Sequence, residues 1–196
     1  MLHRKFILLL SLLILVSFSC KQHVTGNGKI ISDERTVDAF TVVDLLGAAE
    51  VEIIHGNTYS VMVKGYDNIV PLVKTKVTGE TLTVSTIKDI NLSNSDLTIE
   101  ITCPALREVT LSGAGNLVIN SFHQSSMKVS LNGAGNAKFS ESECDSVFAT
   151  LSGAGNMHVN ANDYLEATLN GVGNIEYAGN PIVQSRINGV GNVSKK

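Results

Sequence analysis

The sequence predicts an all-β protein whose second half is a parallel β-helix, and the first observation behind this prediction is a repeated phrase. Six residues of the form Leu/Ile-Ser/Asn-Gly-Ala/Val-Gly-Asn occur five times, and successive copies start 20, 20, 18 and 18 residues apart. A short, regular period is typical of solenoids, where each repeat is too small to bury a core alone and stacks on its neighbours. The copies occupy residues 111–116, 131–136, 151–156, 169–174 and 187–192.

The second observation is that apolar and polar residues alternate on both sides of the phrase. Two residues before its first position stands an apolar side chain in four copies, and the residue between is always polar. In the first four copies the first and third residues after the phrase are also apolar. Alternation with a period of two is the mark of a half-buried strand, so each repeat is predicted to contain two short strands joined by a bend. The apolar pairs are Leu117 and Ile119, Ala137 and Phe139, Met157 and Val159, and Ile175 and Tyr177.

The phrase itself has the chemistry of a bend. Its two glycines allow positive φ or a close backbone approach, and the residue between them, Ala or Val, is expected to point inward at a corner. The Asn that follows tolerates left-handed geometry, and stacked Asn side chains could form an amide ladder. Ser112, Asn132, Ser152, Asn170 and Asn188 could form a second polar row. The predicted turn ladder comprises Gly113, Gly115, Asn116, Gly133, Gly135, Asn136, Gly153, Gly155, Asn156, Gly171, Gly173, Asn174, Gly189, Gly191 and Asn192.

An antiparallel meander is the alternative to the β-helix. Asn132-Gly133, Asn170-Gly171 and Asn188-Gly189 are strong hairpin signals, so the phrase could cap hairpins. A meander needs a second regular turn in each period, however, and the segments between the phrases are unlike one another. Similar bends joined by dissimilar return segments favour the parallel β-helix.

The region before the repeats, residues 26–105, is expected to form irregular β coils that cap the stack and continue into residues 106–196 as one domain. A hairpin is predicted at 78–80, and a capped turn or a short helical turn at 67–71. Residues 46–50 resemble a degraded first copy of the phrase. Alternating runs predict strands at 51–54, 60–64, 81–85, 97–102 and 108–111.

Residues 1–19 are predicted to be a lipoprotein signal peptide. Arg4 and Lys5 precede an apolar run that is too short for a lasting membrane span and ends in Ser19 before Cys20. This pattern resembles the lipobox of bacterial lipoproteins, although Ser17 stands where Leu is usual. Cleavage would leave Cys20 as a lipidated N-terminus that holds the protein at a membrane, with residues 20–25 as a short linker. An ordinary secretory signal with a chance Cys is the alternative.

Composition excludes several functional classes. Without Arg4 and Lys5 the chain has 13 basic and 18 acidic residues, a net charge of −5, and no basic cluster, which argues against nucleic-acid binding. Cys103 and Cys144 lie about two rungs apart in the repeat frame, too far for a disulfide, so two free thiols are predicted. No CxxC pair or His pair has ligand spacing, and Asn stands where calcium-binding repeats carry Asp. We therefore expect neither a metal nor a cofactor.

An ordered series of motifs runs along the chain: Gly26–Lys29, Glu34-Arg35, Phe40, Val51–Ile53, Gly56, Tyr59, Asn68 and Pro104–Leu106 leading into the first phrase. Together these motifs resemble the DUF2807 family of exported, adhesin-like proteins with a head GIN domain, which are common in Bacteroidetes. The resemblance covers nearly all of the chain from Val24 to Val193. It implies a right-handed β-helix and a location in the cell envelope, for which we expect the outer membrane, and it brings no catalytic residues.

The sequence gives only weak support for a catalytic site. Some polysaccharide-degrading enzymes are parallel β-helices, and glycoside hydrolysis needs two carboxylates. On polar return segments, however, carboxylates more often form a solvated face. Lys138, His158 and Glu176 would be neighbours on an outer face, where a mixed-charge row is the simpler explanation. The remaining candidates are Glu141, Glu143, Asp145, Asp163 and Glu166, together with His23, His55 and His123, which have no partner identifiable from spacing.

The prediction for function is therefore a lipid-anchored, non-enzymatic binding module of the cell envelope. Stacked strands would display the return segments at intervals of about 4.8 Å, which suits repetitive ligands such as glycans, although a protein ligand is also compatible. An envelope scaffold and a β-helix enzyme are the alternatives. The segments expected to make contact are 120–128, 140–148 and 160–166.

Overall fold

Strands make up nearly all of the regular structure in the computed structural model, which describes residues 22–87 and 90–196. The predicted all-β class is confirmed. The signal peptide and Cys20 lie outside the described residues. In the first half the strands are β1 (Gln22–Thr25), β2 (Ile30–Thr36), β3 (Val42–Leu46), β4 (Glu50–His55), β5 (Ser60–Tyr66), β6 (Val73–Thr78), β7 (Thr81–Thr86), β8 (Ile90–Ser93) and β9 (Thr98–Cys103), with a 3-10 turn, η1 (Val70–Leu72), before β6.

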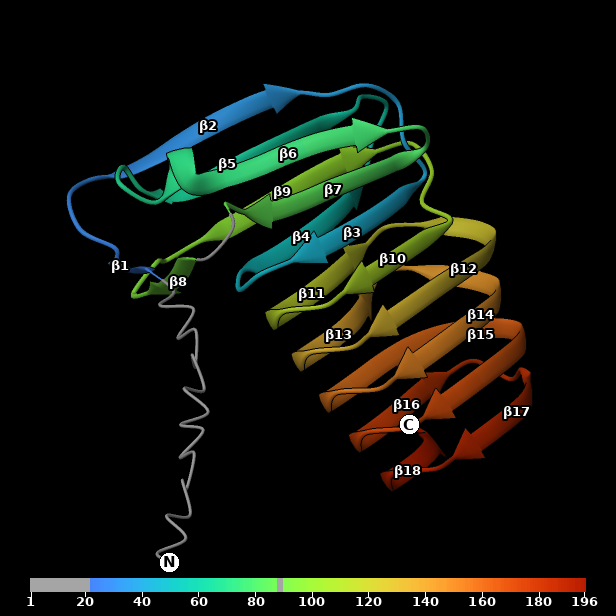
Figure 1. Cartoon of the computed structure of the whole chain (residues 1–196). Helices are drawn as coiled ribbons and strands as arrows, with labels where there is room; N and C mark the ends of the chain where they lie inside the picture. The colour runs from blue at the N-terminus through green and yellow to red at the C-terminus, as the bar shows by residue number, and fades with distance from the viewer. Residues whose placement is uncertain (1–21, 88–89) are drawn as a thin grey trace, which may run out of the picture.

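In the second half the chain passes back and forth between two rows of parallel strands (Figure 1). The first strand row contains β4, β11, β13, β15, β16 and β18, and the second strand row contains β3, β10, β12, β14, β15 and β17. β15 serves both rows because it continues through the return without a break. The strands are β10 (Glu108–Leu111), β11 (Ala114–Asn120), β12 (His123–Leu131), β13 (Ala134–Ser140), β14 (Glu143–Leu151), β15 (Ala154–Leu169), β16 (Val172–Ala178), β17 (Ile182–Ile187) and β18 (Val190–Lys195).

Equivalent residues of successive repeats lie side by side. Leu111 pairs with Leu131, and Ala114 pairs with Ala134, with the same register continuing along both rows. All of these pairs are parallel, so the antiparallel meander considered for the Asn-Gly signals is not formed. Each return segment crosses to the opposite row, and the next strand therefore lies beside its equivalent one repeat earlier.

Close approach of glycine backbones shapes each bend. The second glycine of every copy has a positive φ, between 133° and 151°, a conformation that L side chains rarely adopt. A Cβ on Gly133 would overlap the carbonyl oxygen of Gly113 in the neighbouring repeat. That oxygen accepts a hydrogen bond of 3.0 Å from the amide of Ala134, so successive bends are joined directly through their backbones.

The residue between the two glycines was predicted to point inward, and this prediction is wrong. Ala114, Ala134 and Ala154 are exposed, and Val172 and Val190 are 58% and 69% exposed. The alternation of the strands continues through the bend, which places the glycines where a side chain would meet the backbone of the preceding repeat. The residue between them consequently faces solvent.

The first half makes the large sheet mixed rather than wholly parallel. β2, β5 and β9 pair antiparallel and extend the first strand row, while β6 and β7 form the predicted hairpin and extend the second. The predicted short helical turn is η1. The degraded copy of the phrase also stacks on the repeats, because the amide of Ala114 donates a 3.0 Å hydrogen bond to the carbonyl of Gly47. Gln22–Thr25, assigned to the linker, form β1 and pair with β8 in a separate two-stranded sheet.

One continuous apolar core lies between the two rows. Its side chains are the inward positions of the alternating pattern, and they include the thiols of Cys103 and Cys144, which are both free and fully buried. No helix among the described residues has the length and apolar character needed to cross a membrane. The largest side chains that are fully buried belong to Phe40, Phe122, Ile53, Ile69, Leu82, Ile101, Leu106, Leu111, Leu117, Ile119, Met127 and Leu131.

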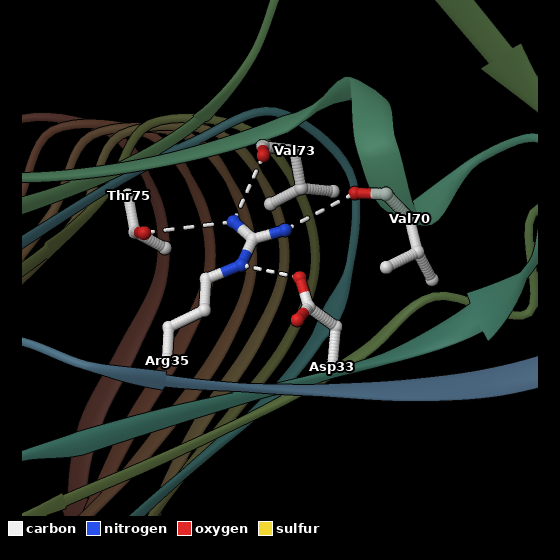
Figure 2. A network of polar contacts seen from close by, with 5 residues as sticks. All are labelled: Asp33, Arg35, Val70, Val73 and Thr75. Atoms are coloured by element: carbon white, nitrogen blue, oxygen red, sulfur yellow. Dashed lines mark hydrogen bonds and ion pairs between the residues drawn. The ribbon is translucent and has the colours of Figure 1, made fainter.

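Arg35 joins the two strand rows at the end where the antiparallel strands lie (Figure 2). It projects from β2 at the edge of the first strand row, and Asp33 orients its Nε at 2.8 Å. Its Nη1 and Nη2 donate to the carbonyl oxygens of Val73 and Val70 at 2.9 and 3.2 Å. Because β6 is the edge of the second strand row, one 18%-exposed side chain spans both edges.

Replacing Gly133 with Val is expected to destabilise the folded protein by about 3 kcal/mol, because the new side chain meets backbone that cannot yield. Thermal unfolding followed by circular dichroism measures this. Ala134→Val is the matched control, since the equivalent positions 172 and 190 already carry Val and the side chain there is solvent-facing. Equal melting temperatures for the two variants would contradict the account of the bend.

Replacing Arg35 with Gln is expected to reduce the free energy of unfolding by about 2 kcal/mol, since the hydrogen bonds that a charged group makes to two carbonyls are lost. The carbonyl of Val70 keeps a second donor, the amide of Val73. Arg107→Gln is the control, because its pair with Glu80 is 65% and 71% exposed and such pairs contribute less than about 1 kcal/mol. Denaturant unfolding of both variants provides the comparison. A smaller loss for Arg35→Gln than for the control would show that the guanidinium does not join the rows.

Candidate functional site

The Asn side chains of the bends form a directional chain of hydrogen bonds. Asn136 donates from Nδ2 to Oδ1 of Asn116 at 2.9 Å, and Asn156 donates from its backbone amide and from Nδ2 to Oδ1 of Asn136. Asn174 makes the same two bonds to Oδ1 of Asn156, and Asn192 donates from its backbone amide to Oδ1 of Asn174. At the other end Asn116 donates to both carboxylate oxygens of Glu50 at 3.1 and 2.9 Å. The amides thus bond one another, which gives this row a structural role in aligning the repeats.

The second polar row is partly linked in the same way. Asn188 donates from Nδ2 to Oδ1 of Asn170 at 2.8 Å, and Asn170 donates to Oγ of Ser152 at 3.4 Å. Both polar rows run beside the exposed Ala and Val residues of the bends.

The three return segments expected to bind a ligand are mostly strands rather than loops. They form much of β12 and β14 and the middle of β15, which lie side by side in the second strand row (Figure 1). Lys128, Phe148 and Glu166 come from the ends of the three segments and stand in register, with Gln184 of β17 next in line. The structure therefore brings the ends of all three segments onto one outer face.

Two aromatic side chains meet on this face. The ring centroids of Phe148 and Tyr164 lie 6.0 Å apart with an interplanar angle of 57°, and Phe148 is 37% exposed. Ile182, which pairs in register with Tyr164, is 76% exposed and extends the apolar surface. We call Phe148 and Tyr164 the aromatic platform. Exposed apolar surface bordered by polar groups is a feature of ligand-binding sites.

Polar groups surround the aromatic platform. The Tyr164 hydroxyl donates to Oε1 of Gln184 at 2.8 Å, which leaves both N–H groups of that amide available as donors. Lys128 on the other side is held by Glu108, with Nζ and Oε1 2.8 Å apart. The platform therefore combines apolar surface with hydroxyl, amide and charged groups.

A groove of about 190 Å³ lies between β15 and β17. Glu166 of β15 and its partner Gln184 of β17 line this groove. Two residues further along the strands, Thr168 and its partner Arg186 line it as well. Carboxylate, amide, hydroxyl and guanidinium groups thus meet in one groove, and its remaining lining consists of Ala167 and Ser185.

Sequence reasoning missed Gln184, Arg186 and the meeting of Phe148 with Tyr164. The signal for Gln184 was present, because the repeat step that leads from Phe148 to Glu166 leads on from there to Gln184. The position of Tyr164 was hidden by a register irregularity. Cys144 pairs with Ala161, whereas Ser146 pairs with Tyr164. Between these two pairs β15 therefore contains one residue more than β14 does.

The carboxylates considered for catalysis are exposed. Glu141 lies between β13 and β14, Glu143 and Asp145 are in β14, and Asp163 and Glu166 are in β15. Of these five, only Glu166 lines the groove. In the described part of the chain no three His, Cys, Asp or Glu side chains are grouped to hold a metal ion.

Lys138, His158 and Glu176 are neighbours in register on the outer face of the first strand row, as expected. His158 Nδ1 lies 3.8 Å from Glu176 Oε2 and has no hydrogen-bond partner within the described residues. Partial burial, together with the charges of Lys196 and Lys138, lowers the pKa of His158 despite the opposing effect of Glu176. The imidazole is therefore neutral at physiological pH, and the contact is not an ion pair there.

The other histidines are separate from one another. His23 Nε2 lies 3.0 Å from Oγ of Ser93, and the His55 ring packs edge-on against Phe122 with centroids 5.5 Å apart. His123 stands opposite Glu143 in the β12–β14 pair. None of the three lines the groove.

The two buried thiols are unreactive at neutral pH. Burial raises the pKa of Cys103 to about 12 and, with the nearby charge of Asp145, raises that of Cys144 to about 11. The thiolate is the reactive form of cysteine, so neither side chain is a nucleophile at neutral pH.

A solved structure of a bacterial protein shares this fold. This "putative adhesin" from Bacteroides fragilis superposes with a TM-score of 0.56 at 22% identity, covering 88% of this chain and all of the other. A second "putative adhesin", from Parabacteroides distasonis, has a TM-score of 0.46 at 18% identity and covers 89% of this chain and all of the other. A "putative lipid binding protein" from the same species has a TM-score of 0.46 at 16% identity, with the same coverage.

Comparison with curated proteins found no match to this chain. The family model described as "Putative auto-transporter adhesin, head GIN domain" matches residues 39–157 and 125–181, which together cover most of the chain. By this match, and by the order of motifs that leads into the first phrase, the chain belongs to the DUF2807 family.

Proposed function

We propose that this protein is a non-catalytic, adhesin-like module of the cell envelope that binds glycans on the outer face of the second strand row. The observation that carries the proposal is the aromatic platform beside the groove. Pyranose rings present C–H faces that pack on aromatic rings, while their hydroxyls need donors and acceptors close by. Phe148, Tyr164, Gln184 and Glu166 offer this combination on one surface.

The regular spacing of the strands also suits a polymer. Groups in register along the second strand row repeat at about 4.8 Å, and Lys128, Phe148, Glu166 and Gln184 follow one another at this interval. A chain of sugars lying along the row would meet a different side chain at each step. A rigid sheet loses little conformational entropy when such a ligand binds.

We further infer that the second half is a right-handed parallel β-helix. The supporting evidence is the parallel register between successive repeats. Crossover connections between parallel strands of one sheet are right-handed in about 98% of cases, because the right-handed twist of the strands lets the connecting segment pack back onto the sheet only with that hand.

Membrane attachment is proposed to occur through Cys20. The support is the short apolar run that ends in Ser19 before this Cys. Lipidation at this position would tether the module to the envelope, and the adhesin-like family favours the outer membrane. Residues 26–196 would then form the exported domain, with its capping strands near the anchor in sequence.

Replacing both Phe148 and Tyr164 with Ala is expected to weaken glycan binding by about 2 kcal/mol, as truncation of aromatic anchors does elsewhere. The wild-type protein and the variant are compared on a panel of neutral and acidic glycans, with hits measured by calorimetry. Lys138→Ala, on the outer face of the other row, is the control and should bind as the wild type does. No binding by the wild type, or unchanged binding by the double variant, would reject the platform as a glycan site.

Replacing Cys20 with Ser is expected to move the protein from the membrane fraction to the soluble fraction, because the thiol that would carry the lipid is lost. Immunoblotting of fractionated cells measures this. Cys103→Ser controls for loss of a cysteine elsewhere and should leave fractionation unchanged. A Cys20→Ser protein that stays with the membrane would show that the anchor lies elsewhere.

A further inference from the structure

We propose that the groove between β15 and β17 selects glycans that carry carboxylate groups, such as uronic acids, with Arg186 as the group that binds the carboxylate. This inference rests on the proposed glycan-binding function and names the class of ligand. It begins from the state of Arg186, whose cationic side chain has no partner to neutralise it in the part of the chain that the structure describes.

The other described arginines are engaged. Arg35 is paired with Asp33 and two carbonyls, and Arg107 lies 3.2 Å from Glu80. Arg186 makes neither an ion pair nor a side-chain hydrogen bond to any described residue, although it lines the groove and its strand neighbour is Thr168. A guanidinium presents parallel N–H groups that match the two oxygens of a carboxylate, and such bidentate pairs are strong and directional.

The surrounding groups complete a site for one end of an acidic sugar. Thr168 offers a hydroxyl beside Arg186. Gln184 accepts one hydrogen bond at Oε1 from the Tyr164 hydroxyl, and its amide group has two N–H donors that it can offer to a ligand. Two neighbouring side chains of β17 thus supply hydrogen-bond donors, which suits an anion better than a neutral sugar.

Glu166 determines the orientation of the ligand. It stands directly opposite Gln184, two positions before Thr168 on the same strand. A ligand carboxylate above Glu166 would be repelled, whereas sugar hydroxyls there could donate to it. The carboxylate is therefore placed on the Arg186 side of the groove, with the sugar ring extending toward Tyr164 and Phe148.

This selectivity is local and not a result of overall charge. The full chain has a net charge of −3, so its long-range field does not attract anions. Preference for an acidic glycan therefore has to come from the groove. Because Glu166, Gln184 and Arg186 are exposed to solvent, added salt should weaken the preference.

The test uses oligosaccharides of uronic acids, each paired with its methyl ester, which keeps the sugar backbone and removes the charge. Calorimetry on the wild-type protein is expected to show about tenfold tighter binding of the free acid, the gain typical of a charge-assisted hydrogen-bonded pair. Arg186→Gln should lose this preference and keep the affinity for the ester. Arg107→Gln, the matched control, should behave as the wild type does.

The remaining outcomes separate the two proposals. Equal binding of acid and ester by the wild type, or a preference that survives in Arg186→Gln, would overturn the assignment of Arg186 and leave the aromatic platform intact. Binding of neither form, with the neutral panel also negative, would overturn the glycan-binding function itself and this inference with it.

Discussion

The close approach of glycine backbones from one repeat to the next is the contact on which the rest of the structure depends. The amide of Ala134 donates to the carbonyl of Gly113, and the amide of Ala154 donates to that of Gly133. A Cβ at these glycines would occupy the position of the neighbouring carbonyl. The bends consequently stack only when they are in register, and this register is inherited by the strands on both sides. Parallel stacking in turn places equivalent residues of successive repeats side by side. The inward side chains therefore fill one core, and the Asn residues of the bends form one row.

The functional face follows from this arrangement. Side chains that alternate outward on the second strand row acquire their neighbours from the strands one repeat before and one repeat after, and the row becomes a grid of chemically different groups. The bends vary little, because their glycines have no freedom to change. The return segments vary freely, and Phe148, Tyr164 and Glu166 come from them. Constraint at the bends and variety in the return segments are two consequences of the same packing, and they separate structural residues from candidate binding residues.

The antiparallel strands of the first half show how the parallel stack is closed at that end. β2 and β6 are edge strands of the two rows, and Arg35 connects them by donating to the carbonyl of Val73 in β6 and to that of Val70 in the turn before it. Arg35 and Arg186 illustrate two uses of one side chain. The Arg35 side chain is 18% exposed, and Asp33, Val70 and Val73 are its polar partners. The Arg186 side chain lines a groove and makes no hydrogen bond or ion pair with the residues that the structure describes.

The sequence by itself determined the strands, the bends and the pairing of equivalent residues, because a fixed period together with obligatory glycines leaves few ways to stack. It also identified the return segments from which the platform is built. Only the tertiary structure decided that the Ala or Val between the glycines faces solvent and that Arg35 reaches Val70 and Val73, since both depend on the approach of segments distant in sequence. The meeting of Phe148 and Tyr164 was decided in the same way. An extra residue in β15 shifts the register between Cys144 and Ser146, and because side chains alternate with a period of two, such a shift changes which residues share a face.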